Sequence, residues 1–111
     1  MYNFGMDIRN LKKNSDLSYD VAVAKRNALE KARSRQVLVH HGHLFRADPE
    51  TINLVKALID QSVDNVVLLD TNDNPVSIKD PEDFLQRLVQ RNQETLNSYL
   101  ETYETFTSKG K

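Results

Sequence analysis

Residues 36–50, QVLVHHGHLFRADPE, decide how this sequence is expected to fold. Two short apolar runs flank Gly42, and a glycine supplies the positive φ that a tight hairpin turn needs. Asp48 and Pro49 then begin a helix, because aspartate is a favoured N-cap residue and proline is tolerated in the first turn. The stretch therefore predicts a β-hairpin followed directly by a helix.

The same order recurs further along the chain. Residues 65–79, NVVLLDTNDNPVSIK, predict a second hairpin with its turn between Asp70 and Pro75. Asp80 is the expected N-cap of the last helix, and Asp83 resembles the acidic member of a capping box. The two Asp-Pro-Glu steps lie 32 residues apart, which is explained either by an internal duplication or by two helices that share a favoured cap.

Two helices lie outside the hairpins and before the last helix. The first is expected to begin at the N-cap Ser18 and to end near Arg35, with a thin stripe of small residues. That stripe consists of Val21, Ala24, Ala28 and Ala32, with Leu29 beside it. The second helix is expected to end near Val63 and to bury Ile52, Val55, Leu58, Ile59 and Val63.

The predicted fold class is α+β, in the order helix, hairpin, helix, hairpin, long C-terminal helix. Residues 17–111 are expected to form a single domain with a protruding last helix, the helices packing on one face of an antiparallel sheet. Whether the two hairpins join one sheet is open. Residues 1–16 show no helical or alternating period, so we expect a flexible N-terminal arm that is either disordered or docked.

The last helix is predicted from Asp80 to about Thr107, which corresponds to roughly 40 Å. Its seam steps by four and three residues, a period of 3.5: Leu85, Val89, Asn92, Leu96, Tyr99, Tyr103 and Phe106. The far half exceeds what so small a domain can cover. We therefore expect a homo-oligomer interface at Leu96, Tyr99, Tyr103 and Phe106, with Asn92 setting the register. The alternative is that the first helix packs along this seam within one chain.

The amino-acid composition excludes several classes of protein and of chemical site. The chain has 111 residues, 39% of them hydrophobic, and no cysteine, so disulfides, cysteine zinc sites and thiolate nucleophiles are excluded. No apolar run is long enough for a membrane span or a secretion signal, and we expect a soluble protein without membrane contact. Residues 1–46 carry nine Lys and Arg against four Asp and Glu, whereas residues 47–111 carry six against twelve.

The candidate chemical motifs are weak. His40, His41 and His43 cluster at the first turn, but the turn denies them a shared face, so we expect an exposed turn or a polar subunit contact and no metal site. The stretch from Asp70 begins like a calcium loop but has Pro75 where that loop requires glycine, so it is interpreted as a turn. The nearest paired carboxylates, Glu82 with Asp83 and Asp48 with Glu50, lie where helices begin, and no glycine-rich phosphate loop or serine elbow is present. We therefore expect that the protein is not an enzyme and binds no cofactor.

Nucleic-acid binding is a weaker hypothesis. The N-terminal third is basic, with Lys25, Arg26, Lys31, Arg33 and Arg35 on the first helix. The acidic second half would repel phosphate, and no aromatic stacking platform is evident.

Residues 19–106 resemble a domain of unknown function found toward the C-termini of bacteriophage tail-fibre assembly and other tail-associated proteins. The matching residues are Val37, Val39, Gly42, Phe45, Ala47 and Asp48, followed by Ile59 and the terminal helix 80–106. Aromatic residues expected between the second hairpin and its helix are absent. The resemblance implies a non-enzymatic phage structural or assembly protein in the virion or host cytoplasm, acting through self-association and tail components. The alternative is a small cytoplasmic regulatory or nucleic-acid-binding module that uses the basic helix.

Overall fold

The computed structural model describes the backbone of residues 4–108 and the side chains of residues 19–107. Three helices and two hairpins occur in the predicted order, which confirms the α+β class. The elements are α1 (Phe4–Arg35), β1 (Val37–His40), β2 (His43–Arg46), α2 (Pro49–Asp60), β3 (Val66–Leu69), β4 (Pro75–Ile78) and α3 (Pro81–Ser108).

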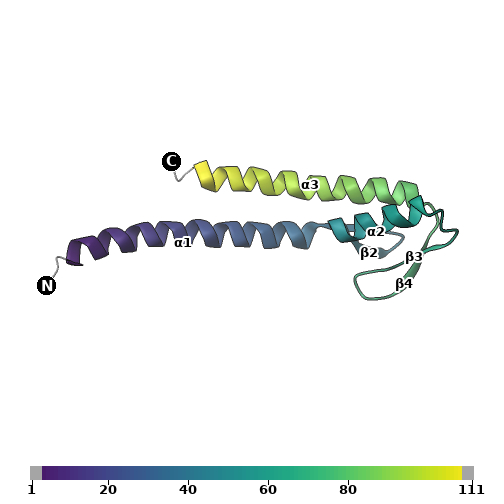
Figure 1. Cartoon of the computed structure of the whole chain (residues 1–111), viewed down its shortest axis with the longest axis horizontal. Helices are drawn as coiled ribbons and strands as arrows, with labels where there is room; N and C mark the ends of the chain where they lie inside the picture. The colour runs from purple at the N-terminus through teal and green to yellow at the C-terminus, as the bar shows by residue number, and fades with distance from the viewer. Residues whose placement is uncertain (1–3, 109–111) are drawn as a thin grey trace.

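The molecule is elongated, measuring 75 × 26 × 25 Å along its principal axes. Both hairpins and α2 gather at one end, around the first half of α3 (Figure 1). From there α1 and α3 lie side by side in opposite directions. We call residues 36–90 the head, and residues 19–35 of α1 with residues 91–107 of α3 the stalk.

The hairpins form two separate two-stranded sheets. In the first, Val39 pairs with Leu44 and Leu38 with Phe45; in the second, Val66 pairs with Ile78. The expectation that the helices cover one face of a single sheet is therefore not met. The reason is that the second hairpin meets β2 through its turn: the Thr71 N–H donates to the Leu44 carbonyl at 2.8 Å.

The turn of the first hairpin has the predicted geometry. His41 and Gly42 both have positive φ, 50° and 79°, as a two-residue type I′ turn requires. This turn matches the right-handed twist of the strands that it joins. The hairpin thus places His40 and His43 opposite each other at the end of the ladder.

The core lies where the first hairpin meets α3. Phe45 and Phe84 are fully buried, with ring centroids 5.1 Å apart in an edge-to-face arrangement. Leu88, one turn further along α3, is also fully buried. The remaining buried apolar residues come from α2 and the second hairpin, with one residue between β2 and α2: Ala47, Val55, Val66, Leu68 and Ile78. The first half of α3 is therefore the element on which the head is assembled.

Both predicted aspartate caps are confirmed. The Thr51 N–H donates to Asp48 Oδ1 at 2.9 Å, and the Asp83 N–H donates to Asp80 Oδ1 at 3.2 Å. The Asp83 side chain instead pairs with Arg87 one turn along, at 2.9 Å, so the contact in the structure is an ion pair along the helix.

Two helix boundaries differ from the prediction. α2 ends at Asp60 rather than near Val63, because Ser62 adopts a φ of +55° and the Ser62 and Val63 N–H groups bond back to the last turn. Val63 is consequently 40% exposed and not part of the buried stripe.

α1 begins at Phe4, so Ser18 is not its N-cap. An N-cap residue favours a helix start but does not enforce one, and no proline interrupts the chain between Phe4 and Arg35. The backbone of residues 4–16, which were predicted as part of a flexible arm, belongs to α1, whereas residues 1–3 and the side chains of this segment lie outside the described part of the chain.

Replacing Gly42 with valine is expected to destabilise the protein by about 1–2 kcal/mol. A Cβ at this position would meet nothing within 4 Å, so the loss would come from backbone strain at positive φ and not from a clash. Gly42→Asn is the matched control, because asparagine tolerates this region and should lose much less. Equal losses in urea unfolding of the two variants would contradict this explanation.

Asp48→Ala is expected to lower the free energy of unfolding by about 1 kcal/mol, because the Thr51 N–H loses its acceptor. Asp48→Ser should retain most of the stability, since the serine hydroxyl also accepts that bond. Thermal unfolding followed by circular dichroism compares the two. A serine variant as unstable as the alanine variant would show that capping is not the role of Asp48.

Candidate functional site

Arg91 joins the stalk to the head. Its Nε–H lies 3.1 Å from the carbonyl oxygens of both Arg35 and Val37, at the end of α1 and the start of β1. A cation is favourable at the carbonyl end of a helix, where the backbone dipoles leave partial negative charge. This bifurcated contact fixes the point at which α1 leaves the head and directs it along α3.

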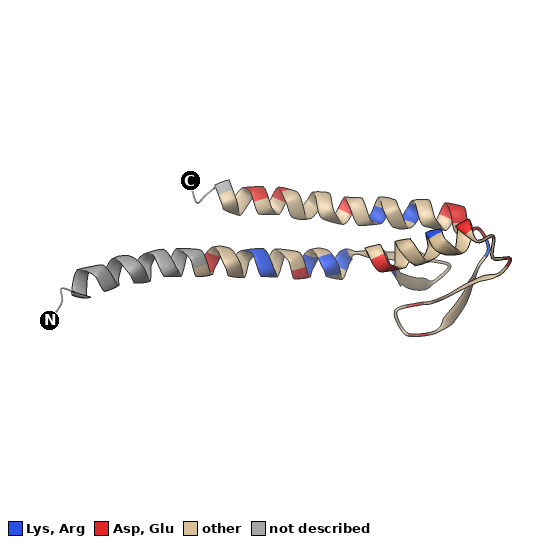
Figure 2. Ribbon diagram, viewed as in Figure 1, with Lys and Arg blue, Asp and Glu red and all other residues tan. Residues whose placement is uncertain are grey.

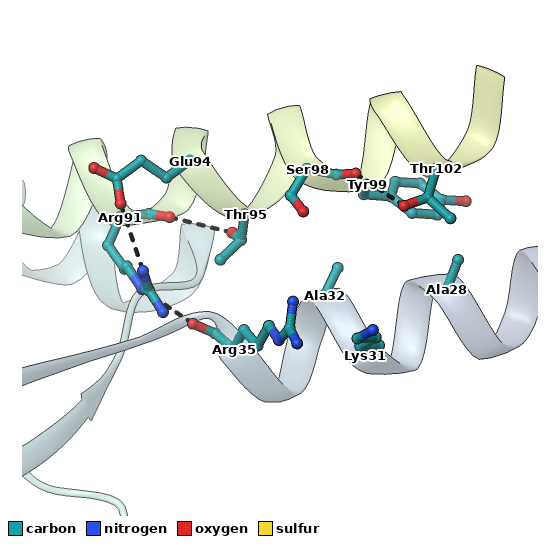
Figure 3. A pocket seen from close by; sticks show the side chains of 10 residues that line it. All are labelled: Ala28, Lys31, Ala32, Arg35, Arg91, Glu94, Thr95, Ser98, Tyr99 and Thr102. Carbon is teal, nitrogen blue, oxygen red and sulfur yellow. Dashed lines mark hydrogen bonds and ion pairs between the residues drawn. The ribbon is translucent and has the colours of Figure 1, made fainter. Parts of the chain in front are cut away.

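A groove runs between the two stalk helices. It has a volume of about 390 Å³ and is lined on α1 by Ala28, Lys31, Ala32 and Arg35, and on α3 by Arg91, Glu94, Thr95, Ser98, Tyr99 and Thr102 (Figure 3). Small side chains on α1 face hydroxyl-bearing side chains on α3. The contact between the helices therefore has no continuous apolar core, and the alternative predicted from sequence, α1 packed along α3 within one chain, is the arrangement in the structure.

The predicted interface residues do not share one environment. Leu96 and Tyr103 remain 41% and 37% exposed, whereas Tyr99 and Phe106 are half-buried. The rings of Tyr99 and Phe106 lie 6.1 and 5.3 Å from the ring of Tyr103. Leu100, at 51% exposure, lies one turn from Leu96. We call Leu96, Leu100 and Tyr103 of α3, together with the half-buried Leu29 of α1, the apolar flank.

Asn92 has a different role from the one predicted. It is buried against the head, where its Nδ2 donates to the Ala47 carbonyl at 3.0 Å. Thr95, one turn later, is also buried and donates to the Asn92 carbonyl. Asn92 therefore positions the chain between β2 and α2 against α3 and is not available to set the register of an oligomer.

The predicted seam does not separate the part of α3 that packs on the head from the part that lies in the stalk, because it assigns all seven positions to one face of the helix. The face that packs on the head runs through Phe84, Leu88, Asn92 and Thr95, whereas Val89 and Leu96 lie beside it and are exposed. The signal was present in the sequence: Phe84 and Leu88 are spaced by four, one residue before Leu85 and Val89.

A buried carboxylate links the two hairpins. Asp70 Oδ2 accepts a hydrogen bond from His43 Nδ1 at 2.9 Å, and its Oδ1 accepts the N–H groups of Asn72 and Asn74. The hydrogen bond from His43 and those from the turn hold the pKa of Asp70 at about 2, below the ordinary 3.8. The segment that resembled a calcium loop is thus a turn, as predicted, organised by Asp70.

The three histidines occupy three environments. His41 is exposed at the turn, whereas His40 packs edge-on against Phe84 with centroids 5.0 Å apart. Burial lowers the pKa of His40, and the neighbouring His41 acts in the same direction. His43 is held by Asp70, a partner 27 residues away that its sequence neighbourhood does not suggest. The expectation of a wholly exposed turn therefore holds for His41 alone.

Within the described residues, no group of three or more His, Cys, Asp and Glu residues is arranged to hold a metal ion. The helices of that same part of the chain include none long and apolar enough to cross a membrane. No protein-family model, curated protein or solved structure matches this chain. Among the described residues, the apolar flank is the strongest candidate for a functional site.

The linked hairpins predict a pH-dependent stability. Because the pKa of Asp70 is lower in the folded protein, its contribution is complete above its ordinary pKa of 3.8 and is lost as the pH falls through about 2. Asp70→Asn should therefore be less stable than the unmodified protein at about pH 6, and the difference should shrink between about pH 4 and pH 2. Urea unfolding across this range measures it; a difference independent of pH would contradict the role of the charge.

Proposed function

We propose that this protein is a non-enzymatic bacteriophage structural or assembly protein that acts through protein–protein interaction and self-association. The observation that carries the proposal is the apolar flank of the stalk, on which Leu96, Leu100 and Tyr103 are between 37% and 51% exposed. Burial of a side chain of this size contributes roughly 1.5–3 kcal/mol. Covering the flank is therefore a substantial driving force for association.

The architecture of the stalk supports self-association. A helix with an apolar stripe needs another element that covers the stripe. In the stalk, α1 is the only described element that packs against α3. α1 contributes mainly Ala28 and Ala32 to that contact, and a groove remains between the helices. A second copy would supply the missing layer, and two helical hairpins together make a four-helix bundle.

The phage part of the proposal rests on the resemblance of residues 19–106 to the domain found in tail-associated proteins. Residues 19–106 span the stalk part of α1, both hairpins, α2 and most of α3. Val37, Gly42, Phe45 and Asp48 belong to the first hairpin and its helix cap, so most of the shared motif serves the fold. Other tail components are the proposed partners, and the virion or host cytoplasm is the proposed location.

The nucleic-acid alternative is favoured by one observation. Lys25, Arg26, Lys31, Arg33 and Arg35 are all exposed on the stalk part of α1 (Figure 2). Salt separates the two functions: a complex with about six phosphate contacts would weaken on the order of a thousandfold between about 50 and 200 mM salt, whereas association through the apolar flank would change little. Titration of labelled duplex and single-stranded DNA or RNA at both salt concentrations provides the comparison.

Leu96→Glu combined with Tyr103→Glu is expected to convert an oligomer into a monomer that keeps its head. Charges on the apolar flank would have to be desolvated on association, whereas the core around Phe45 and Phe84 is untouched. Sedimentation velocity at high micromolar concentration reports the mass, and the far-UV circular dichroism reports the fold.

The matched control is Ser98→Glu combined with Thr105→Glu. It adds the same charge to the same helix with the same seven-residue spacing, but at exposed positions that lie two residues from Leu96 and Tyr103 and therefore on the side away from the flank, so it should leave the oligomer intact. If the unmodified protein is a monomer at these concentrations, the self-association is refuted.

A further inference from the structure

The two sides of the stalk differ in character. Successive residues of a helix are about 100° apart, so residues two apart point to nearly opposite sides. Lys31 and Ser98 lie on the side where the groove opens (Figure 3), and the residues two positions from them, Leu29, Leu96 and Leu100, lie on the opposite side. The apolar flank is therefore one continuous side of the stalk, contributed by both helices, and it faces away from the groove.

The two stalk helices also carry opposite charge. Residues 19–35 of α1 contain five Lys and Arg against two Asp and Glu, whereas residues 91–107 of α3 contain one Arg against three Glu (Figure 2). A second copy that covers the apolar flank can approach in two symmetric ways. A two-fold axis along the stalk sets each α3 against the other copy's α1, and an axis across the stalk sets α3 against α3 and α1 against α1.

We infer that two copies dock through their apolar flanks with both heads at the same end, so that each α3 lies against α1 of the partner subunit. The inference rests on the proposed self-association and adds its partner surface and orientation. In this arrangement a basic helix faces an acidic helix on both sides of the axis, whereas the alternative sets like charges side by side. All four helices then alternate in direction, as in an up-and-down bundle.

Arg26 and Glu104 border the flank in positions suited to meet across this interface. Arg26 is three residues from Leu29, and Glu104 is four residues from Leu100, so each neighbours the flank on its own helix. Arg91 bonds to the Arg35 carbonyl, which fixes the antiparallel register of the two helices. In this register Arg26 is level with Leu100, about 6 Å along the axis from Glu104. Both side chains are exposed and long enough to close that separation.

Charge reversal tests the orientation. Arg26→Glu and Glu104→Arg should each raise the Kd of the dimer on the order of tenfold at low salt, because each places two like-charged pairs at the interface. The double variant Arg26→Glu/Glu104→Arg should return the Kd to within about twofold, because both pairs are restored with reversed sign. Sedimentation equilibrium at about 20 mM and 200 mM salt measures these constants, and the effect should fade at the higher salt.

Lys31→Glu and Glu101→Arg are the matched controls. They make the same changes of charge on the same helices, but Lys31 lines the groove, and Glu101 is two residues from Tyr103 and so points to nearly the opposite side of α3 from it. These variants should leave the Kd nearly unchanged. Single variants at 26 and 104 that behave like these controls, or a double variant that is not rescued, would overturn the orientation while self-association still stands.

A distance measurement tests the orientation independently. The chain has no cysteine, so Gln90→Cys, Asn97→Cys and Thr105→Cys each give one spin label on an exposed position of α3. With both heads at one end, the distance between equivalent labels should stay similar along the helix. With heads at opposite ends, the axial part of that distance would change by about 3 Å for each residue moved along α3, which would overturn the inference. An absence of any dimer signal would instead refute the proposed function.

Discussion

The contact of the Arg91 guanidinium with the carbonyl oxygens of Arg35 and Val37 is the interaction on which the shape of this molecule depends. Hydrogen bonds to a charged group contribute more than neutral ones, roughly 1.5–3 kcal/mol. The contact fastens the end of α1 and the start of β1 to the middle of α3. It therefore ties the stalk and the head to the same turn of one helix.

The two halves of α3 consequently have different roles. The first half carries Phe84 and Leu88 into the core, and Asn92 extends that contact to the Ala47 carbonyl. Beyond Thr95 the helix extends past the head, and among the described elements only α1 lies beside it. The exposed leucines and tyrosine of the apolar flank follow from this geometry. The proposal of an assembly protein is the functional interpretation of a helix that is longer than its own domain requires.

Local chemistry made much of the fold predictable. The Gly42 turn, the Asp48 and Asp80 caps and the two hairpins each depend on residues within a few positions of one another, and all of them occur as expected. The structure differs from the prediction where a contact joins residues that are far apart in the sequence. Asn92 was assigned to an oligomer seam because nothing in the nearby sequence indicates that its partner is Ala47. His43 likewise forms a hydrogen bond with Asp70, which is distant in the sequence. The hairpins remain separate sheets because the turn of the second contacts a strand of the first.

Small-angle X-ray scattering of the unmodified protein over a concentration series tests the pairing of two copies, because it reports the mass and the length of the particle together. We expect a scattering mass twice that of one chain, with a maximum dimension that stays close to the 75 Å length of the single molecule, since two copies lie side by side with their heads at one end. A particle with the mass of one chain at every concentration would contradict self-association. A doubled mass with a maximum dimension well beyond 75 Å would contradict the side-by-side arrangement.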